Sequence, residues 1–332
     1  MGNPQNLLVV GAGISGSTIA RRLADEGHRV TIIDRRHHIG GNCYDEIVGN
    51  VRVHRYGPHI FHTNNLSVFN WLSKFTSWVP YCHKVTAFYD NMFLTLPPNL
   101  TTQKILGDRL VDVIFTPYTK KMWGTEVDQQ VLDRVKIRDD HNELYFPNDK
   151  YQFLPEHGYT SMIANMLDHD HITVKIDTNY DKSMEGEFDH VFNSMSIDEY
   201  YGFTYGVLPY RSIKFHNIFE QPHTFPTAVV NYTDNGPYTR ATSWNTFPNH
   251  GNGELYTLEE PCDFTDNNNE RYYPINDNGG VNRAIYKLYS KIQNDKVTFI
   301  GRCGMYLYLD MDMAVSNAMS IVKKFIKKYD RN

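Results

Sequence analysis

The chain has 332 residues, 41% of them hydrophobic, and a formal net charge of −5. This length is sufficient for a large core and more than one domain, and the slightly acidic balance argues against binding to nucleic acid or to an anionic membrane. The four cysteines, Cys43, Cys82, Cys262 and Cys303, are widely spaced without a CxxC pair, which argues against a zinc site and a disulfide framework. No apolar stretch is long enough to span a bilayer, so we expect a cytoplasmic protein without a bound metal.

The strongest local pattern lies in residues 7–34. It consists of an apolar run over 7–10, the glycines Gly11, Gly13 and Gly16, apolar residues at helical spacing over 14–23, a second apolar run over 30–33, and Asp34. This order of strand, glycine turn, helix, strand and acid is the dinucleotide-binding fingerprint. The glycines permit a tight turn and a close approach to a pyrophosphate, while the helix N-terminus attracts its charge. Asp34 can accept hydrogen bonds from a ribose diol.

The middle of the chain changes its pattern twice. Residues 66 to about 125 have apolar positions at helical spacing, as at Val68, Trp71 and Leu72, which predicts helices broken near residues 97–98. Residues 140 to about 260 alternate short apolar runs with turn-forming clusters, which is typical of strands; the clearest are residues 229–232 and 255–258. The mostly polar segment 266–280 predicts a loop.

The C-terminal segment has the pattern of a nucleotide-binding domain. Residues 296–302 predict a strand that ends at a glycine, and residues 313–328 predict an amphipathic helix. We therefore expect the two ends of the chain to share one core, with inserted domains between them.

Motifs along nearly the whole chain resemble those of the UDP-galactopyranose mutase family. They are residues 40–46 (GGNCYDE), 53–65 (VHRYGPHIFHTNN), 118–124 (YTKKMWG), 144–160, 197–212, 238–240 (YTR), 272–275 (YYPI) and 301–312 (GRCGMYLYLDMD). Because they occur in the family's order, the resemblance is far more specific than the glycine fingerprint alone.

The resemblance implies an isomerase that interconverts UDP-galactopyranose and UDP-galactofuranose through a covalent adduct of the sugar's anomeric carbon with N5 of reduced FAD. It implies an α/β fold, in which a Rossmann-like FAD-binding domain carries an inserted helical domain and an antiparallel β-sheet domain. The expected boundaries are 1–65 and 296–332 for the FAD-binding domain, 66–135 for the helical insertion with a mobile substrate loop, and 136–295 for a mixed segment. This segment would hold the antiparallel sheet and returning parts of the FAD domain. A UDP-sugar is the expected partner, and a homodimer is one possible oligomeric state.

The resemblance also implies roles for individual residues. The cofactor-binding set is Gly11, Gly13, Ile14, Ser15, Gly16, Asp34, Arg35, Gly41, Asn42, His59, Ile60, Arg302, Asp310 and Met311. The substrate-binding set is Tyr118, Thr119, Trp123, Arg134, Tyr145, Arg240, Tyr273, Arg302 and Tyr308. Arg240, Arg302 and His59 are the expected catalytic residues. Guanidinium groups suit a diphosphate leaving group, and His59 matches the family histidine near the flavin that supports its redox state. Arg138 competes with Arg134, and Tyr272 with Tyr273. Arg211 is interpreted as structural.

Several departures from the family pattern bear on the substrate. Met122 replaces a loop glutamine, residues 193–196 replace a glycine-containing turn, and Leu307 replaces a more polar residue. These changes leave three alternatives open: a mutase acting on another nucleotide sugar, a flavin-dependent oxidoreductase of the amine-oxidase-like class, and a nucleotide-sugar-binding homologue without catalysis.

Overall fold

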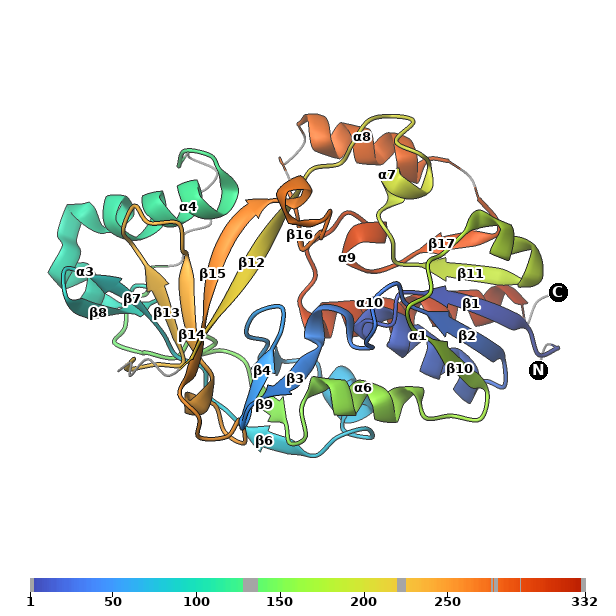
Figure 1. Cartoon of the computed structure of the whole chain (residues 1–332), viewed down its shortest axis with the longest axis horizontal. Coiled ribbons are helices and arrows are strands. Elements are labelled where there is room, and N and C mark those ends of the chain that lie inside the picture. The colour runs from blue at the N-terminus through green and yellow to red at the C-terminus, as the bar shows by residue number, and fades with distance from the viewer. Residues whose placement is uncertain are drawn as a thin grey trace.

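The computed structural model describes residues 3–127, 137–219, 225–275, 277, 280–292 and 294–329. A five-stranded parallel sheet forms the centre of the dinucleotide-binding domain, in the strand order β10-β2-β1-β11-β17 (Figure 1). Its strands are β1 (Asn6–Val10), β2 (Arg29–Ile33), β10 (Ile172–Lys175), β11 (His190–Asn193) and β17 (Val297–Phe299). The sheet therefore combines segments from the beginning, the middle and the end of the chain, as expected for a domain with insertions.

Two long helices pack together beside this sheet. Helix α1 (Ile14–Asp25) follows β1 directly, and α10 (Met311–Tyr329) is the last described element. Ile19 and Leu23 of α1 are fully buried, as is Val315 of α10, because the apolar stripes of both helices face the same core. Helix α6 (Tyr159–Leu167) also packs against α1. The predicted final helix is present and begins two residues earlier, at Met311.

A seven-stranded sheet forms the second body of the molecule, at the left in Figure 1, in the order β16-β12-β15-β14-β13-β7-β8. Its strands are β7 (Val85–Tyr89), β8 (Met92–Leu96), β12 (Tyr210–Phe219), β13 (Val229–Tyr232), β14 (Arg240–Ser243), β15 (Leu255–Asp263) and β16 (Tyr273–Pro274). All neighbours are antiparallel except β7 and β13. The predicted strand 229–232 is present as β13, and 255–258 is the first half of β15.

The prediction of a helical segment over 66–125 is incomplete. Helices α2 (Leu66–Leu72), α3 (Leu100–Leu106) and α4 (Thr116–Trp123) are present, but β6 (Trp78–Pro80), β7 and β8 lie between α2 and α3. The sequence VTAFY of β7 is rich in β-branched and aromatic residues, which favour strands. Its partner β13 is distant in sequence, so the pairing is not visible locally.

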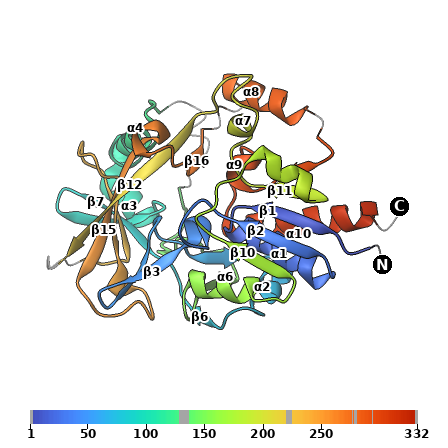
Figure 2. The same cartoon turned by 45° about the vertical axis from the view of Figure 1, so that its right-hand side comes forward.

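Smaller elements connect the two bodies, as the turned view in Figure 2 shows. They are the hairpin β3 (Asp45–Val48) and β4 (Val51–His54), and the sheet of β5 (Phe61–Thr63), β9 (Tyr151–Pro155) and β6. Helices α7 (Ile197–Tyr200), α8 (Val281–Ser290) and α9 (Gly301–Gly304) complete the described α-helices. Among all the residues that the structure describes, no helix combines the length and apolar character needed to cross a membrane.

Candidate active site

The described residues form two cavities that share part of their lining. The first, of about 340 Å³, is lined by the glycine turn after β1 and by the end of β2. The second, of about 500 Å³, is lined by the inner face of the seven-stranded sheet and by α4. His59, Arg302 and Met311 line both cavities. A ligand in one cavity is therefore adjacent to a ligand in the other.

The first cavity is bordered by two glycine turns that pack backbone against backbone. Gly11 has a φ of +97°, and a Cβ on Gly16 would lie 1.9 Å from the Gly11 carbonyl oxygen. Gly13 and Gly40 form an isolated β-bridge, and a Cβ on Gly41 would lie 2.7 Å from the Cα of Gly13. Side chains at Gly11, Gly16 and Gly41 are therefore sterically excluded, and the N-terminus of α1 stays open to a ligand.

Asp34 organises the turn at the end of β2. Its Oδ2 accepts a hydrogen bond of 2.8 Å from the backbone N–H of Ala12, and its Oδ1 accepts one of 2.9 Å from the N–H of Arg36. The carboxylate is buried and joins the glycine turn after β1 to the turn after β2. Its remaining lone pairs are available to a ribose.

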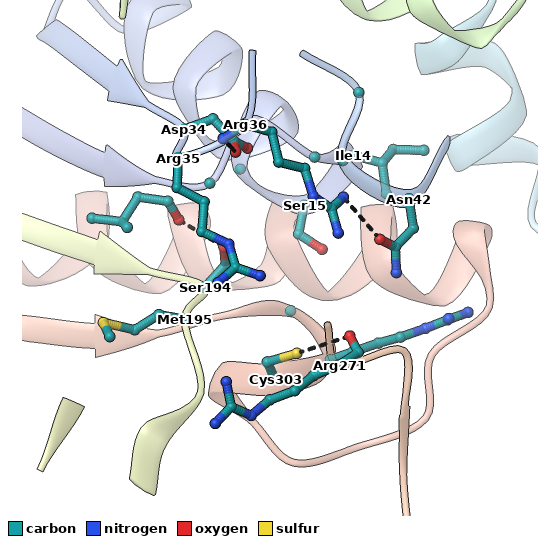
Figure 3. Close-up of a pocket in the computed structure, with 18 of the residues that line it drawn as sticks. Ile14, Ser15, Asp34, Arg35, Arg36, Asn42, Ser194, Met195, Arg271 and Cys303 are labelled. Atoms are coloured by element: carbon teal, nitrogen blue, oxygen red, sulfur yellow. Dashed lines mark hydrogen bonds between the residues drawn. The ribbon is translucent and has the colours of Figure 1, made fainter. Parts of the chain in front are cut away.

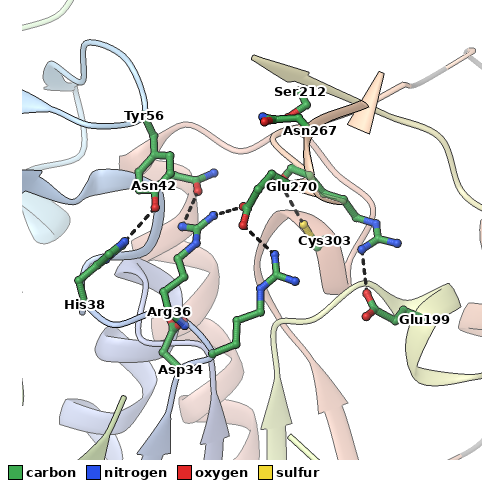
Figure 4. Close-up of polar contacts among 12 residues, drawn as sticks. Asp34, Arg36, His38, Asn42, Tyr56, Glu199, Ser212, Asn267, Glu270 and Cys303 are labelled. Atoms are coloured by element: carbon green, nitrogen blue, oxygen red, sulfur yellow. Dashed lines mark hydrogen bonds and ion pairs between the residues drawn. The ribbon is translucent and has the colours of Figure 1, made fainter. Parts of the chain in front are cut away.

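Glu270 and Arg36, beside Asp34, were missed by the sequence interpretation, whereas their partners Arg35 and Asn42 were predicted. Glu270 forms ion pairs with both Arg35, at 3.1 Å, and Arg36 (Figure 4). The Arg36 guanidinium also donates to Asn42 Oδ1, at 3.1 Å, and lies 4.4 Å from the ring centroid of Tyr56. Glu270 therefore links the loop before β16 to the mouth of the first cavity. No local signal could identify it, because its partners are more than 230 residues away.

The unusual turn after β11 is accommodated in the first cavity (Figure 3). Ser194 Oγ donates a hydrogen bond of 2.7 Å to the Val10 carbonyl oxygen, and a Cβ on Gly11 would lie 2.0 Å from that Oγ. Ser194 and Met195 both line the cavity. The substituted turn thus packs against Gly11 and leaves the fingerprint geometry intact.

The floor of the second cavity is a row of polar residues across the sheet. Asn231, Arg240 and Glu259 are register partners on β13, β14 and β15. Arg240 Nε lies 3.7 Å from Glu259 Oε2. Burial raises the pKa of Glu259, and the neighbouring Arg240 opposes that rise. Glu259 was missed, although it is two residues beyond Thr257 on β15 and therefore lies on the same buried face as Leu255 and Thr257.

Tyrosines form the walls around this floor. Tyr118, Tyr145, Tyr273 and Tyr308 line the second cavity. Burial raises the pKa of Tyr118 to about 12, so its hydroxyl is protonated and can donate a hydrogen bond at neutral pH. Tyr272 does not line the cavity among the described residues; its ring packs near Tyr56 and Phe215.

Arg302 lies where the two cavities meet. Its guanidinium carbon is 4.8 Å from the ring centroid of Tyr308 and 5.6 Å from that of Tyr273, and these two rings stack at 6.0 Å. Arg302 Nε donates a hydrogen bond of 2.8 Å to the Leu309 carbonyl oxygen. The cation is therefore held in a fixed place by aromatic faces and by the backbone.

His59 is the second residue at the junction. Its Nδ1 donates a hydrogen bond of 2.8 Å to the Gly57 carbonyl oxygen. Burial and the positive charge of Arg302 together lower the pKa of His59 to about 4. The imidazole is neutral at pH 7, and Nε2 is its acceptor. Ile60 and Asp310 line the second cavity beside it.

Helix α4 supplies the end of the second cavity. Trp123 lines it, with its ring 6.4 Å from that of Tyr273 in an edge-to-face arrangement. Met122 is buried in an apolar cluster with Ile213 and Tyr272, so the replacement of the family glutamine makes this wall apolar. Thr119 is buried and is absent from the described lining of either cavity.

Arg134 and Arg138 were alternative predictions for one substrate-binding arginine. Arg134 lies outside the described residues. The guanidinium of Arg138 donates to the carbonyl oxygens of Asn142, at 3.2 Å, and Tyr145, at 3.1 Å. Arg211 donates to the carbonyl oxygens of Met122 and Lys121 and so holds the C-terminal end of α4, as its structural interpretation requires.

The remaining cofactor candidates, Ile14, Ser15, Arg35 and Asn42, all line the first cavity. Among the described residues, no group of three or more His, Cys, Asp or Glu side chains is placed to hold a metal ion. The fold and the site define a Rossmann-like dinucleotide-binding α/β protein with an adjoining cavity lined by arginines and tyrosines.

Comparison with known proteins places the chain in a family. A family model described as UDP-galactopyranose mutase matches residues 113–308, and one described as NAD(P)-binding Rossmann-like domain matches residues 9–75. A probable UDP-galactopyranose mutase of Klebsiella pneumoniae is 34% identical over 98% of this chain and 95% of that protein. A dTDP-fucopyranose mutase of Escherichia coli is 33% identical over 97% of this chain and 98% of that protein. The chain belongs to the UDP-galactopyranose mutase family and is an isomerase.

The fold agrees with this assignment. The crystal structure of a reduced UDP-galactopyranose mutase superposes with a TM-score of 0.69, at 12% identity, over 97% of this chain and 94% of that one. At this identity the match concerns the fold alone.

Proposed function

We propose that the protein interconverts UDP-galactopyranose and UDP-galactofuranose with reduced FAD as its cofactor. The observation that carries the proposal is the junction of the two cavities at His59, Arg302 and Met311. A nucleotide-sugar in the tyrosine-lined cavity would meet a flavin ring that extends from the glycine-lined cavity. The family assignment supports the reaction class.

The residues of the first cavity fit a flavin dinucleotide. The backbone of Gly13 and Gly41 is too close for a side chain at Gly41, which leaves a bare surface at the N-terminus of α1. Such a surface accepts a pyrophosphate, because its N–H groups and the helix dipole favour negative charge. Asp34 and Asn42 are placed to accept and donate hydrogen bonds at the same cavity. Reduced FAD would supply N5 as the nucleophile for the anomeric carbon of the sugar.

The protein's own contribution is to bind and neutralise the leaving UDP. Arg240 and Arg302 supply two permanent positive charges in the second cavity, where their forked donors match diphosphate oxygens. Tyr118, Tyr273 and Tyr308 supply neutral hydroxyl donors nearby. Fixed donors of this kind stabilise charge that develops as the bond to the sugar breaks.

His59 is proposed to contact the flavin from the junction. Because the imidazole is neutral, it adds no charge beside a reduced ring, and its Nε2 can accept a hydrogen bond. Asp310 and Met311 belong to the same junction, at the start of α10.

The direct test measures the isomerisation itself. The purified protein, reconstituted with FAD and reduced with dithionite, is incubated with UDP-galactofuranose, and the pyranose form is measured by chromatography. We expect conversion that requires the reduced flavin. Oxygen consumption without prior reduction would instead favour an oxidoreductase, and UDP binding without any turnover would favour an inactive homologue.

A second candidate substrate is a dTDP-linked 6-deoxy sugar. The dTDP-fucopyranose mutase relative is within one percentage point of identity of the UDP-galactopyranose mutase relative. The apolar wall formed by Met122 and Ile213 is compatible with a methyl group. The same assay with dTDP-fucofuranose, compared by kcat/KM, distinguishes the two substrates.

A further inference from the structure

Two buried histidines lie behind His59 and connect it to a distant loop. His54 ends β4 and is 1% exposed, and His250 follows β14 in sequence and is 3% exposed. His54 Nδ1 accepts a hydrogen bond of 3.0 Å from the backbone N–H of His59. His54 Nε2 and His250 Nε2 are 3.1 Å apart. His250 Nδ1 lies 2.8 Å from the carbonyl oxygen of Pro248.

These contacts assign the tautomers of both rings. The Pro248 carbonyl oxygen can only accept, so His250 carries its proton on Nδ1 and presents a lone pair at Nε2. The backbone N–H of His59 can only donate, so His54 presents a lone pair at Nδ1 and carries its proton on Nε2. The proton on His54 Nε2 then points to the lone pair of His250. Each of the four ring nitrogens is therefore either a donor or an acceptor, and no two donors or two acceptors face each other.

The arrangement requires both rings to be neutral. A second proton on His54 would occupy the nitrogen that accepts from His59, and a second proton on His250 would oppose the Nε2–H of His54. Burial lowers the pKa of both histidines, which agrees with the geometry. The charged or titratable groups near the pair are Arg52, Asp45, His59 and Tyr159, and the rings of Trp244 and Phe247 enclose it.

The pair is anchored to the protein framework on both sides. The backbone carbonyl of His250 accepts a hydrogen bond of 2.8 Å from the N–H of Arg52 on β4. A Cβ on Gly251 would lie 1.9 Å from the carbonyl oxygen of Asn50, so the loop that holds His250 is pressed against the β3–β4 turn. The position of the His59 backbone is thereby tied to the loop after β14, the strand that carries Arg240.

We propose that His54 and His250 are positioning residues that fix the backbone of His59 at the junction of the two cavities and, through it, the reach of His59 Nδ1–H to the Gly57 carbonyl oxygen. The inference rests on the proposed function for the role of His59 in turnover, but its structural part stands without it. His54 holds the backbone N–H of His59, and His250 keeps His54 in the one tautomer that can do so.

Two side-chain replacements at His54 separate positioning from simple packing. His54→Asn places an amide oxygen near the place of Nδ1, so it can still accept from the His59 N–H. His54→Phe keeps an aromatic ring of similar size but has no acceptor. At His250, Gln can accept from His54 Nε2–H, whereas Phe cannot.

The test compares these variants with the native protein. We expect His54→Phe and His250→Phe to lower kcat about 10- to 100-fold, the cost of an ångström-scale misplacement, with little change in KM. His54→Asn and His250→Gln should recover most of the loss. Equal losses in the amide and phenyl variants, or losses confined to the melting temperature, would overturn the proposal.

A second readout needs no turnover. Nitrogen-15 spectra of histidine side chains in the ligand-free protein should show His59 as one tautomer, protonated on Nδ1, in the native protein and in His54→Asn. In His54→Phe the His59 signals should shift toward a mixture of tautomers. If the native protein lacked mutase activity but His54→Phe showed this shift, the proposed function would fail and the positioning role would stand. An unchanged His59 spectrum in His54→Phe would remove the positioning role itself.

Discussion

Arg240 and Glu259 are register partners on β14 and β15, with Arg240 Nε 3.7 Å from Glu259 Oε2. Within the described part of the chain, both Arg240 Nε and Glu259 Oε1 are buried without a hydrogen-bond partner. Buried polar atoms of this kind are costly unless a ligand or water completes their hydrogen bonds. Their place on the floor of the second cavity therefore favours a ligand rich in oxygen atoms.

Replacing Arg240 tests this relationship. We expect Arg240→Ala to lower kcat/KM about 10²- to 10³-fold, the cost of removing one donor that stabilises developing charge. Arg240→Lys should recover only part of the activity, because an ammonium keeps the charge but loses the fork. Flavin absorbance should show that the cofactor stays bound. Arg55→Ala, which removes a surface ion pair with Glu46, is the matched control. Native kcat/KM in Arg240→Ala would exclude its proposed role.

Replacing Arg302 should change the titration of His59. Burial and Arg302 both lower the pKa of His59, which is about 4. In Arg302→Ala the charge contribution disappears and burial remains, so the pKa should rise but stay below the ordinary value of 6.5. The pKa is measured from the side-chain nitrogen shifts of His59 in a pH titration. A pKa of His59 that does not move would mean that the guanidinium does not act on this ring.

The sequence predicts those parts of the structure that depend on neighbours along the chain. The fingerprint from Gly11 to Asp34 is visible because strand, turn and helix are contiguous, and β13 has a strand pattern of its own. Strand β7 was missed because its parallel pairing with β13 crosses more than 140 residues. Apolar residues at helical spacing on both sides of β7 therefore led to the prediction of helices throughout residues 66–125.

The same limit applies to the site. The family motifs predict Arg240, Arg302 and Tyr273, all of which line the second cavity. Residues that act by holding another side chain carry no motif of their own. Examples are Glu270, which pairs with Arg36, and His250, which pairs with His54. Their importance arises only when the fold brings distant segments together.

Trp123 should contribute to UDP affinity. It lines the second cavity and is only partly buried, so its removal should affect binding more than folding. We expect Trp123→Ala to weaken UDP binding by about 1–3 kcal/mol, by analogy with the stacking of nucleic-acid bases on aromatic rings. Trp123→Phe, which keeps an aromatic face, should recover most of the affinity. Titration calorimetry with UDP measures both, and equal affinities for the Ala variant and the native protein would place the base elsewhere.

Glu270 should modulate the attraction of the first cavity for anions. It neutralises Arg35 and Arg36 together. In Glu270→Gln the two cations lose their counter-ion, so we expect FAD to bind about two- to fivefold more tightly at low salt, and the gain to vanish at high salt.

The control for Glu270 is Glu46→Gln, which removes the exposed ion pair between Glu46 and Arg55 without changing the charge beside the cavity. Fluorescence titration of the apoprotein with FAD at several salt concentrations measures the effect. Weaker FAD binding by Glu270→Gln at every salt concentration would contradict the electrostatic account and show that Glu270 acts by ordering its loop.

The buried histidines should make the protein unstable in mildly acidic solution. Burial lowers the pKa of six of them from the ordinary 6.5: His59 and His190 to about 4, His83 to about 3, and His38, His54 and His250 in the same direction. Between pH 6.5 and about 4 the unfolded chain binds protons that the folded protein does not, so stability falls as the pH decreases. Each such histidine contributes up to ~1.4 kcal/mol per pH unit.

We therefore expect the melting temperature to fall steeply from pH 6.5 to pH 5, a range in which carboxylates with ordinary pKa values stay ionised. His190→Gln, which removes one of the six histidines, should reduce the proton uptake on unfolding at pH 5 by about one. Calorimetry in buffers of different ionisation enthalpy measures this uptake. A melting temperature that stays constant from pH 7 to pH 5 would mean that these histidines are already protonated in the folded protein, and the neutral pair of His54 and His250 would then be excluded as well.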